Sequence, residues 1–389
     1  MDGARSRSLA LALGGLIALA AAMGIGRFVY TPILPYMEQA LGLSKAEAGV
    51  VASANFLGYL LGALGAAAGR LPGGRQPWFL AALGGSAATT AAMGLASAVP
   101  VFLVLRFLGG VASAFVLVFG SALVLDRLAQ AGRPGLSSLH FAGVGSGIAA
   151  SAVLVWSLAA AGADWRALWL ASGALSLLAL LAARTLVPGE AEAGAVPPAE
   201  AAAPAGGDRR LLILALAYGL FGFGYVITAT FISTMVRSLP EIAALEGLVW
   251  LVVGLAAVPS VAFWAWIGRR WGNDRSFALA CLVEGIGVAL SVLVTGPVAI
   301  VVAAALLGGT FMGITALGLI NARTLSRGDP RRSIAMMTAA FGLGQMIGPS
   351  FAGYAYRFGD SFLLPSLVAA GALVISAALA QTLRLAKNA

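Results

Sequence analysis

The chain contains one cysteine, one histidine and few charged residues, which make up 10% of its 389 positions. A single cysteine excludes an intrachain disulfide and any CxxC metal or redox site. The sequence also lacks a Walker motif, a nucleophilic triad, an acid/base pair and a metal-binding constellation. We therefore expect neither an ATP-driven pump nor an enzyme, and no cofactor.

The scarcity of charge goes with a large excess of apolar residues. Hydrophobic residues make up 60% of the chain, and the mean hydropathy is +0.95. This chain has too little polar surface to cover a water-soluble globule of its length, so we expect lipid to be its solvent. The formal net charge of +9 does not indicate nucleic-acid binding, because the basic residues lie in short loops between apolar stretches.

Twelve apolar stretches, most of them about 20 residues or longer, are of the length that crosses a bilayer as a helix. They are predicted at 9–37, 48–69, 77–98, 101–125, 138–161, 166–187, 211–236, 244–267, 276–296, 298–324, 333–357 and 362–384. Residues 188–208 contain Pro, Ala, Gly and acids but no large apolar side chain, which is typical of a flexible, solvated linker. The sequence thus predicts an all-α integral membrane protein with a six-helix bundle at 1–187, a cytoplasmic linker at 188–208 and a second six-helix bundle at 209–389.

Basic residues are distributed unevenly between the two sides of these twelve spans. If the N-terminus is cytoplasmic, eighteen fall on the cytoplasmic side: Arg5, Arg7, Arg70, Arg75, Arg127, Arg133, Arg184, Arg209, Arg210, Arg269, Arg270, Arg275, Arg323, Arg327, Arg331, Arg332, Arg384 and Lys387. Four fall on the other side, namely Lys45, Arg166, Arg237 and Arg357. The positive-inside rule therefore predicts that both termini are cytoplasmic.

An internal repeat supports the same division. At an offset of 199 residues, Gly69-Arg70 aligns with Gly268-Arg269, Leu108-Gly109-Gly110 with Leu307-Gly308-Gly309, and Gly143-Val144-Gly145 with Gly342-Leu343-Gly344. Any one match could be chance in a glycine-rich chain, but one offset shared by three separate places makes chance an inadequate explanation. Two related membrane bundles are the usual construction of a secondary transporter.

Three sequence strings resemble a known family. They are GIGRFVYTPILPYM at 24–37, SANFLGY at 53–59 and HFAGVGSGI at 140–148, and they are similar to the YbfB/YjiJ-type branch of the major facilitator superfamily. The resemblance implies the twelve-helix major facilitator fold, a monomer and alternating access in a bacterial inner membrane. Gly69 stands where the superfamily's loop motif usually has Asp, and the proline of the antiporter motif is absent beside Gly143 and Gly147, so antiport is not predicted.

Two arginines lie inside predicted spans. A charge in hydrocarbon costs about 2.5–3.5 kcal/mol on insertion scales, so each needs an explanation. Arg27 precedes Pro32 and Pro35, and Arg106 lies at a comparable depth in the fourth span. In the implied fold both helices line the central cavity, where two cations without an obvious carboxylate would favour an anionic substrate. The alternative is structural: the arginines would bond to backbone carbonyls freed by the prolines, or to Glu38.

Two further ionisable residues are candidates for proton coupling. Glu284 lies near the middle of the ninth span, where burial favours the uncharged carboxyl and would suit a proton carrier. The alternative is hydrogen bonding between helices. His140 begins the fifth span near the predicted cytoplasmic face and could respond to protons. The alternative for His140 is solvation, or a bond to a loop such as the one that carries Asp126.

Uncharged polar residues at cavity depth complete the predicted substrate site. They are Tyr30, Thr31, Asn55 and Tyr59 in the first half, and Tyr225, Thr228 and Gln345 in the second. Tyr225 occupies the repeat position of Arg27, so the two halves would present different chemistry to one ligand. Such a site suits a small organic ion with an apolar or ring portion, although Tyr and Asn also serve as ordinary hydrogen-bond partners between helices.

Small residues are expected to allow close helix contacts. Gly58, Gly62, Gly65 and Gly69 recur on one stripe of the second span, and Gly143 and Gly147 lie on the fifth. Such contacts suit bundles that rock between two states, so these glycines are assigned to packing and gating.

The sequence therefore predicts a secondary-active transporter of a small organic solute. An organic anion or zwitterion, moved together with protons, is favoured because Arg27 and Arg106 are buried cations. One rival is efflux of amphipathic or cationic drugs, which would require an acidic cavity. A second rival is a sensor or scaffold that transports nothing, a role for which the chain offers no sizeable soluble appendage. Expected partners are the solute, the lipid bilayer and protons, with no nucleic acid.

Overall fold

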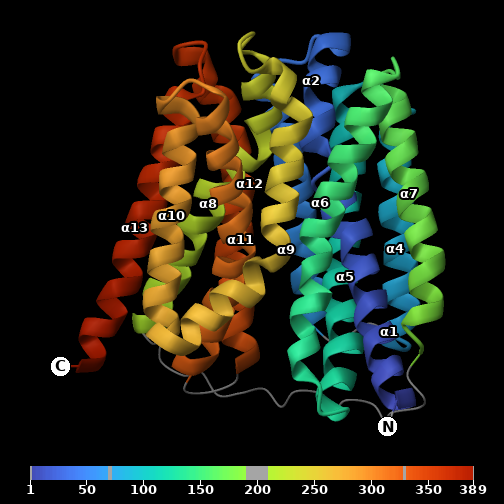
Figure 1. Ribbon diagram of the computed structural model, residues 1–389, viewed down its shortest axis with the longest axis vertical. Helices are drawn as coiled ribbons and strands as arrows, with labels where there is room; N and C mark the ends of the chain where they lie inside the picture. Colours follow the sequence, from blue (N-terminus) through green and yellow to red (C-terminus); the bar gives the residue numbers. More distant parts are fainter. Residues whose placement is uncertain (1, 69–71, 190–208, 327–329, 389) are drawn as a thin grey trace.

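The computed structural model describes residues 2–68, 72–189, 209–326 and 330–388, and all regular elements within these ranges are helical. The first half contains α1 (Asp2–Leu19), η1 (Ala20–Ile25), α2 (Tyr30–Leu41), α3 (Lys45–Ala67), α4 (Arg75–Met93), α5 (Val99–Gln130), η2 (Pro134–Leu136), α6 (Ser137–Ala160) and α7 (Trp165–Leu186). The second contains α8 (Arg209–Arg237), η3 (Ala243–Leu245), α9 (Glu246–Trp271), α10 (Asn273–Leu293), α11 (Pro297–Leu325), α12 (Pro330–Ala355), η4 (Tyr356–Phe358) and α13 (Leu363–Asn388). Figure 1 shows the two halves side by side, with both chain ends at the same end of the molecule. The predicted fold of two six-span bundles is confirmed.

One span is less apolar than the others. Eleven helical segments of the described chain are long and apolar enough to cross a membrane, and α4 is not among them. Ser86, Thr89 and Thr90 reduce its hydropathy, but the hydroxyls of Thr89 and Thr90 donate hydrogen bonds of 2.8 and 2.7 Å to carbonyls one turn earlier, at Gly85 and Ser86. Such back-bonding satisfies their polar groups within the helix. With α4 packed between α5 and α7, the count is twelve.

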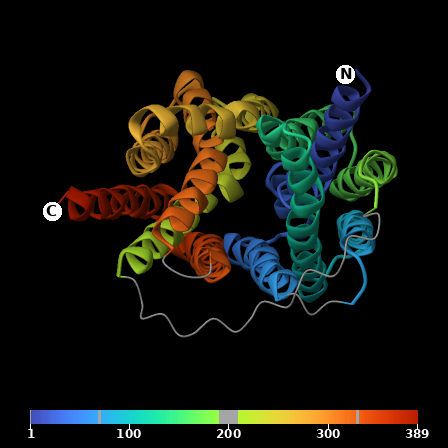
Figure 2. The same cartoon turned by 90° about the horizontal axis from the view of Figure 1, so that it is seen from below.

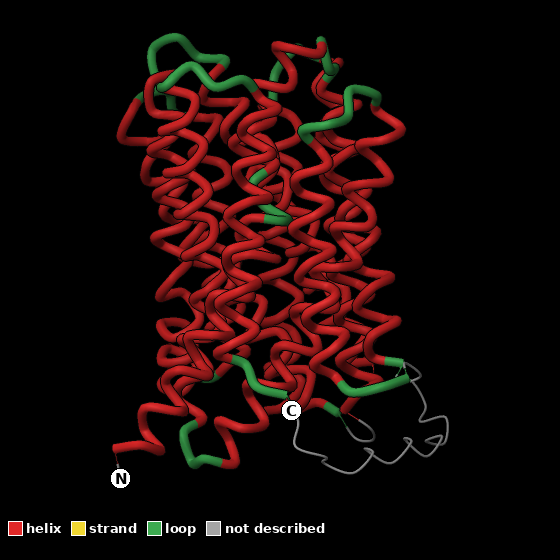
Figure 3. The backbone as a smooth tube through the Cα atoms, turned by 90° about the vertical axis from the view of Figure 1, so that its right-hand side faces the viewer, coloured by secondary structure: helices red, strands yellow, loops and turns green. Residues whose placement is uncertain are grey.

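The first span is broken near its middle. A π-helical turn, η1, follows α1, and residues 26–29 are not helical before α2 begins. Pro32 has no N–H to donate to the Phe28 carbonyl, so the break lies directly before the first proline, whereas Pro35 is accommodated inside α2. Figure 3 shows the break as a loop within the helical body. In hydrocarbon, backbone groups freed by such a break need partners elsewhere in the protein.

Two long seams join the halves, one between α3 and α12 and the other between α6 and α9. Figure 2 shows the seams on opposite sides of the molecule. In Figure 1 the halves meet at the end away from the termini and diverge toward the end that holds them. Figure 1 shows that the lower part of α9 bends away from the first half, and this helix contains Pro259, a residue that commonly kinks helices.

The predicted packing glycines lie at close contacts between helices, with one exception. A Cβ atom at Gly58 would overlap the Phe107 carbonyl of α5, and one at Gly62 would press on Val111 of the same helix. Gly65 has no atom within 4 Å of the position of a Cβ, so the expected stripe stops one turn early. Gly143 and Gly147 of α6 lie against the backbone of Leu16 and Ala20 in the first span. Gly69 and the linker from residue 190 lie outside the described residues.

Replacing Gly58 with alanine should therefore destabilise the protein. Its methyl group would force α3 and α5 apart, at a cost of about 1–3 kcal/mol for an overpacked site. Gly65→Ala is the matched control on the same helix, where alanine meets open space and should be neutral or slightly stabilising. Thermal unfolding of purified protein in detergent measures both, and equal shifts in the two variants would contradict the packing assignment.

Candidate functional site

Arg27 lies at the break in the first span and reaches into the second half. Its Nη2 donates a hydrogen bond of 2.7 Å to Oε1 of Gln345 in α12. The guanidinium carbon lies 4.1 Å from the ring centre of Tyr59, 4.7 Å from that of Phe56 and 5.4 Å from that of Phe28. The residue is only 3% exposed, and its Nε has no partner. Arg27 is thus a buried cation held by aromatic faces and one amide.

The hydrogen-bond chain continues within the second half. Nε2 of Gln345 donates to the hydroxyl of Tyr225 in α8. The Tyr225 ring lies nearly parallel to Phe311 and Phe341, with ring centres 5.6 and 6.0 Å away. Among the ion pairs of the described residues, none includes Arg27. Arg27, Gln345 and Tyr225, all predicted from cavity depth, therefore meet where the two halves join, without a carboxylate to balance the charge.

Arg106 contacts the backbone at the break in the first span. Its Nη1 and Nη2 donate hydrogen bonds of 3.0 and 2.9 Å to the carbonyls of Gly26 and Arg27. Its guanidinium lies 5.0 Å from the ring centre of Tyr30, and Asn55 Nδ2 donates to the Arg106 carbonyl at 2.8 Å. These contacts match the structural alternative, in which the arginine satisfies freed backbone carbonyls. The other proposed structural partner, Glu38, instead pairs with Lys45.

Some of the remaining predicted polar residues join helices within one half, and one of them links the two halves. The hydroxyl of Tyr30 donates to the carbonyl of Ala48, which links α2 to α3 within the first half. Thr31 crosses between the halves and donates a 2.7 Å hydrogen bond to the Ala229 carbonyl of α8. Thr228 is buried, and its hydroxyl has no partner. Tyr30 and Asn55 thus hold helices together, whereas Thr31 lies on the junction with Arg27.

Glu284 and His140 are both buried, but in different surroundings. Both carboxyl oxygens of Glu284 lack a hydrogen-bond partner, and Thr310 of α11 is its polar neighbour. Nε2 of His140 lies 3.1 Å from the Ser121 hydroxyl of α5, within the first half. The expectation that His140 is solvated or bonded near Asp126 is wrong, since His140 is 0% exposed and Asp126 pairs with Arg75.

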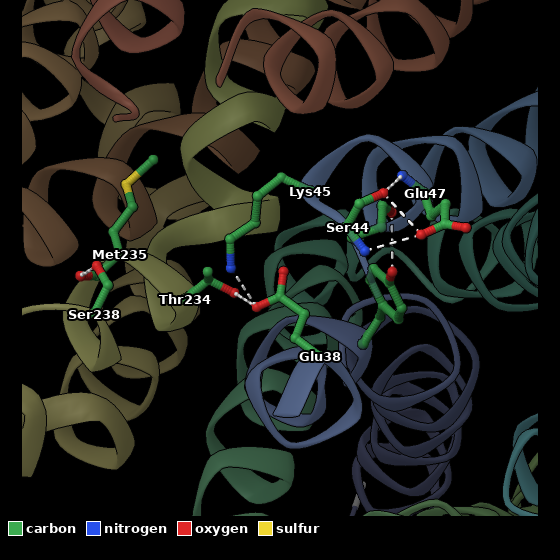
Figure 4. A network of polar contacts seen from close by, with 9 residues as sticks. Glu38, Ser44, Lys45, Glu47, Thr234, Met235 and Ser238 are labelled. Atoms are coloured by element: carbon green, nitrogen blue, oxygen red, sulfur yellow. Dashed lines mark hydrogen bonds and ion pairs between the residues drawn. The ribbon is translucent and has the colours of Figure 1, made fainter. Parts of the chain in front are cut away.

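A polar network that the sequence analysis missed closes the end away from the termini. Lys45 Nζ lies 2.7 Å from Oε2 of Glu38, and Thr234 of α8 donates to the same oxygen at 3.2 Å. Figure 4 shows this group next to the capping box of Ser44 and Glu47 that begins α3. Because Glu38 and Lys45 belong to the first half and Thr234 to the second, the network joins the halves.

A second cluster lies at the same end. Arg237 of α8 pairs with Glu246 of α9 at 3.1 Å, donates to Gln39 Oε1 at 3.3 Å and covers the Tyr36 ring at 4.0 Å. The sequence analysis treated Lys45 and Arg237 only as topology markers. The signal that could have found them is a carboxylate close by in sequence, seven residues before Lys45 and nine after Arg237.

With this geometry established, comparison with known proteins identifies the family. The family described as "Uncharacterised MFS-type transporter YbfB" matches residues 19–381. The chain belongs to this family. Two solved structures of the nucleoside transporter NupG, one of them a mutant, share the fold: the mutant matches with a TM-score of 0.73 at 17% identity, over 96% of this chain and 99% of that one. The other has a TM-score of 0.70 at 16% identity, over 97% and 99%. No curated protein matches the chain.

Membership of the family makes the protein a multi-pass membrane transporter of small solutes rather than an enzyme. The predicted resemblance to the YbfB/YjiJ-type branch is confirmed. At 16–17% identity the NupG structures support the fold, but they carry no information about this chain's substrate.

The contacts of Arg106 yield a test of its role. Arg106→Ala should lower the free energy of unfolding by at least about 3 kcal/mol, because two charge-assisted hydrogen bonds to buried carbonyls are lost. Arg106→Lys, the control, keeps the charge but not the planar fork that reaches both carbonyls, and should recover only part of the loss. Thermal unfolding is the measurement. An Arg106→Ala protein with full stability and no ligand binding would instead make Arg106 a substrate contact.

Proposed function

We propose that this protein is a proton-coupled secondary transporter of small organic anions or zwitterions, working as a monomer by alternating access in a bacterial inner membrane. The observation that carries the proposal is Arg27, a buried cation at the junction of the halves with one hydrogen bond and no acidic partner among the described residues. A buried, unpaired charge is costly, and a bound carboxylate would offset that cost.

The surroundings of Arg27 favour a solute with a flat or apolar part. Phe56 and Tyr59 offer ring faces on the side of the first half, and Tyr225 and Phe311 stack on the side of the second. Aromatic faces bind flat rings by offset stacking and apolar groups by exclusion of water. The Gln345 amide occupies the position where a carboxylate would meet Arg27, so the solute would displace it.

The closed end indicates the side of the membrane to which this conformation opens. The bonds of Thr234 to Glu38 and of Arg237 to Gln39 hold the halves together at one end, whereas the halves diverge at the other. The uneven distribution of basic residues supports cytoplasmic termini, which would make this the inward-facing state. Opening to the outside would require both of these polar contacts to break.

Glu284 is our candidate for the proton carrier. It is a buried carboxyl near the middle of α10, and neither of its oxygens has a hydrogen-bond partner among the described residues. His140 is the weaker candidate because it is sealed inside the first half beside Ser121.

A ligand screen tests the sign of the solute. Organic acids or zwitterions should raise the thermal unfolding temperature, and Arg27→Ala should weaken their binding about 10- to 100-fold, the loss for one charge-assisted hydrogen bond. Gln345→Ala is the control: it keeps the guanidinium and removes a competing amide, so acids should bind at least as well.

Other outcomes of the same screen would overturn the proposal. Stabilisation by amphipathic cations alone, unchanged in Arg27→Ala, would favour the drug-efflux rival. Because the similar solved structures are those of a nucleoside transporter, the panel should include nucleosides. Their binding in both the parent and Arg27→Ala would mean that ring stacking, and not charge, selects the solute.

Replacement of Glu284 tests the coupling. Glu284→Gln has nearly the same shape but cannot release a proton, so uptake into proteoliposomes should no longer respond to a pH gradient. Exchange of labelled for unlabelled solute should persist, because it does not require net proton movement. His140→Gln is the comparison variant. If that variant alone lost the gradient response, coupling would belong to the histidine.

A further inference from the structure

A pocket of about 310 Å³ opens beside the α6–α9 seam at the closed end of the molecule. Its walls come from both halves: Tyr36 and several residues of α6 from the first, and Arg237, Glu246 and residues of η3 from the second. The pocket is separate from the Arg27 site, since none of the residues around that guanidinium lines it. The proposal below does not depend on which solute is transported.

The polar side of the pocket presents one cation and one anion together. Arg237 and Glu246 pair at 3.1 Å, with 33% and 12% of their side chains exposed. Only Oε2 of Glu246 takes part in that pair. The Tyr36 ring supports the guanidinium from the other side, at 4.0 Å. Neighbouring charges of opposite sign, both reachable from one pocket, are complementary to a zwitterion whose own charges are a few bonds apart.

The other side is apolar and faces the bilayer. Ala152 and Ala159 of α6 form a smooth wall, and Trp156 between them is 50% exposed. Nearby Val153 and Leu248 are 47% and 37% exposed, which is expected of side chains that contact lipid. An exposed tryptophan near the end of a span is typical of the membrane–water interface. The mouth therefore lies where phospholipid headgroups meet acyl chains.

We propose that this pocket binds a phospholipid with a phosphate and a primary ammonium group. The phosphate would accept hydrogen bonds from Arg237, the ammonium would donate to Glu246, and the start of an acyl chain would lie along the alanine wall beside Trp156. Because the pocket exists only while both halves meet at this end, the lipid would bind the closed end selectively. A ligand that binds one state better than another shifts the population toward it, so this lipid stabilises closure at the end away from the termini.

Headgroup chemistry provides the main test. Purified protein is titrated with short-chain phosphatidylethanolamine, phosphatidylcholine and phosphatidylglycerol, and binding is followed by native mass spectrometry and thermal unfolding. Phosphatidylethanolamine should bind at least about tenfold more tightly than phosphatidylcholine, whose methylated amine cannot donate to Glu246. Glu246→Gln should remove that difference. Equal binding of the ethanolamine and choline lipids by the parent, or equal binding of phosphatidylglycerol, would overturn the proposal.

A filled pocket provides the second test. Ala159→Phe places a ring in the pocket and should abolish binding of all three lipids to this site. The matched control is Ala305→Phe, another half-buried alanine, in a lipid-facing pocket of about 210 Å³ formed by α9, α10 and α11 within the second half. The control should bind phosphatidylethanolamine like the parent. Unchanged lipid binding in a folded Ala159→Phe protein would refute the site. If Ala159→Phe does not fold, the Glu246→Gln variant still tests the proposal, because it should no longer prefer phosphatidylethanolamine to phosphatidylcholine.

The conformational consequence is measured separately. Spin labels at Ala161→Cys and Glu241→Cys, both exposed and one in each half, report the distance across the closed end. The natural Cys281 is buried. Phosphatidylethanolamine should increase the short-distance population in this pair and leave it unchanged when Glu246→Gln is added. An effect of equal size with phosphatidylcholine would contradict selective closure.

Discussion

Every backbone polar group inside a bilayer must find its partner within the protein, and the first span meets this constraint in an unusual way. Its break exposes the carbonyls of Gly26 and Arg27, and Arg106 from α5 donates to both. One buried cation thus fixes the geometry of the break. The break in turn directs Arg27 toward the second half, where Gln345 and Tyr225 continue the contact. Arg106 therefore bonds the backbone of the same residue whose side chain reaches Gln345.

The two arginines show what could be predicted from the sequence, namely their depth in the membrane, and what could not, namely the partners of their side chains. Span lengths, the repeat and the distribution of basic residues predicted the fold, because crossing a bilayer imposes local requirements on length and hydropathy. They also placed Arg27 and Arg106 at a comparable depth. The depth of a residue does not determine where its side chain points, however. Only tertiary packing shows that the Arg106 guanidinium donates to backbone carbonyls while that of Arg27 reaches Gln345 in the other half. His140 was misjudged for the same reason, since its helix end is covered by α1 and α5.

Polar contacts between the halves occur at two levels. At the closed end they involve charged groups, with Glu38 held by Lys45 and Thr234. In the middle they are the bond from Arg27 to the Gln345 amide and the bond from Thr31 to the Ala229 carbonyl. The first level could hardly be predicted, because Glu38 and Thr234 are far apart along the chain and meet only when the bundles assemble. The middle level could be anticipated, because unusual residues for hydrocarbon mark it.

The α6–α9 seam has a consequence for membrane energetics. A Cβ atom at Gly145 would collide with the backbone of Gly254 and Val258, and one at Gly254 would collide with Ala149. The two helix backbones touch so closely there that no methyl group fits between them, and a water molecule needs at least comparable room. A continuous file of water molecules through a membrane protein would let protons cross the bilayer. Direct contact between the two helix backbones therefore leaves no room for water along this stretch of the α6–α9 seam.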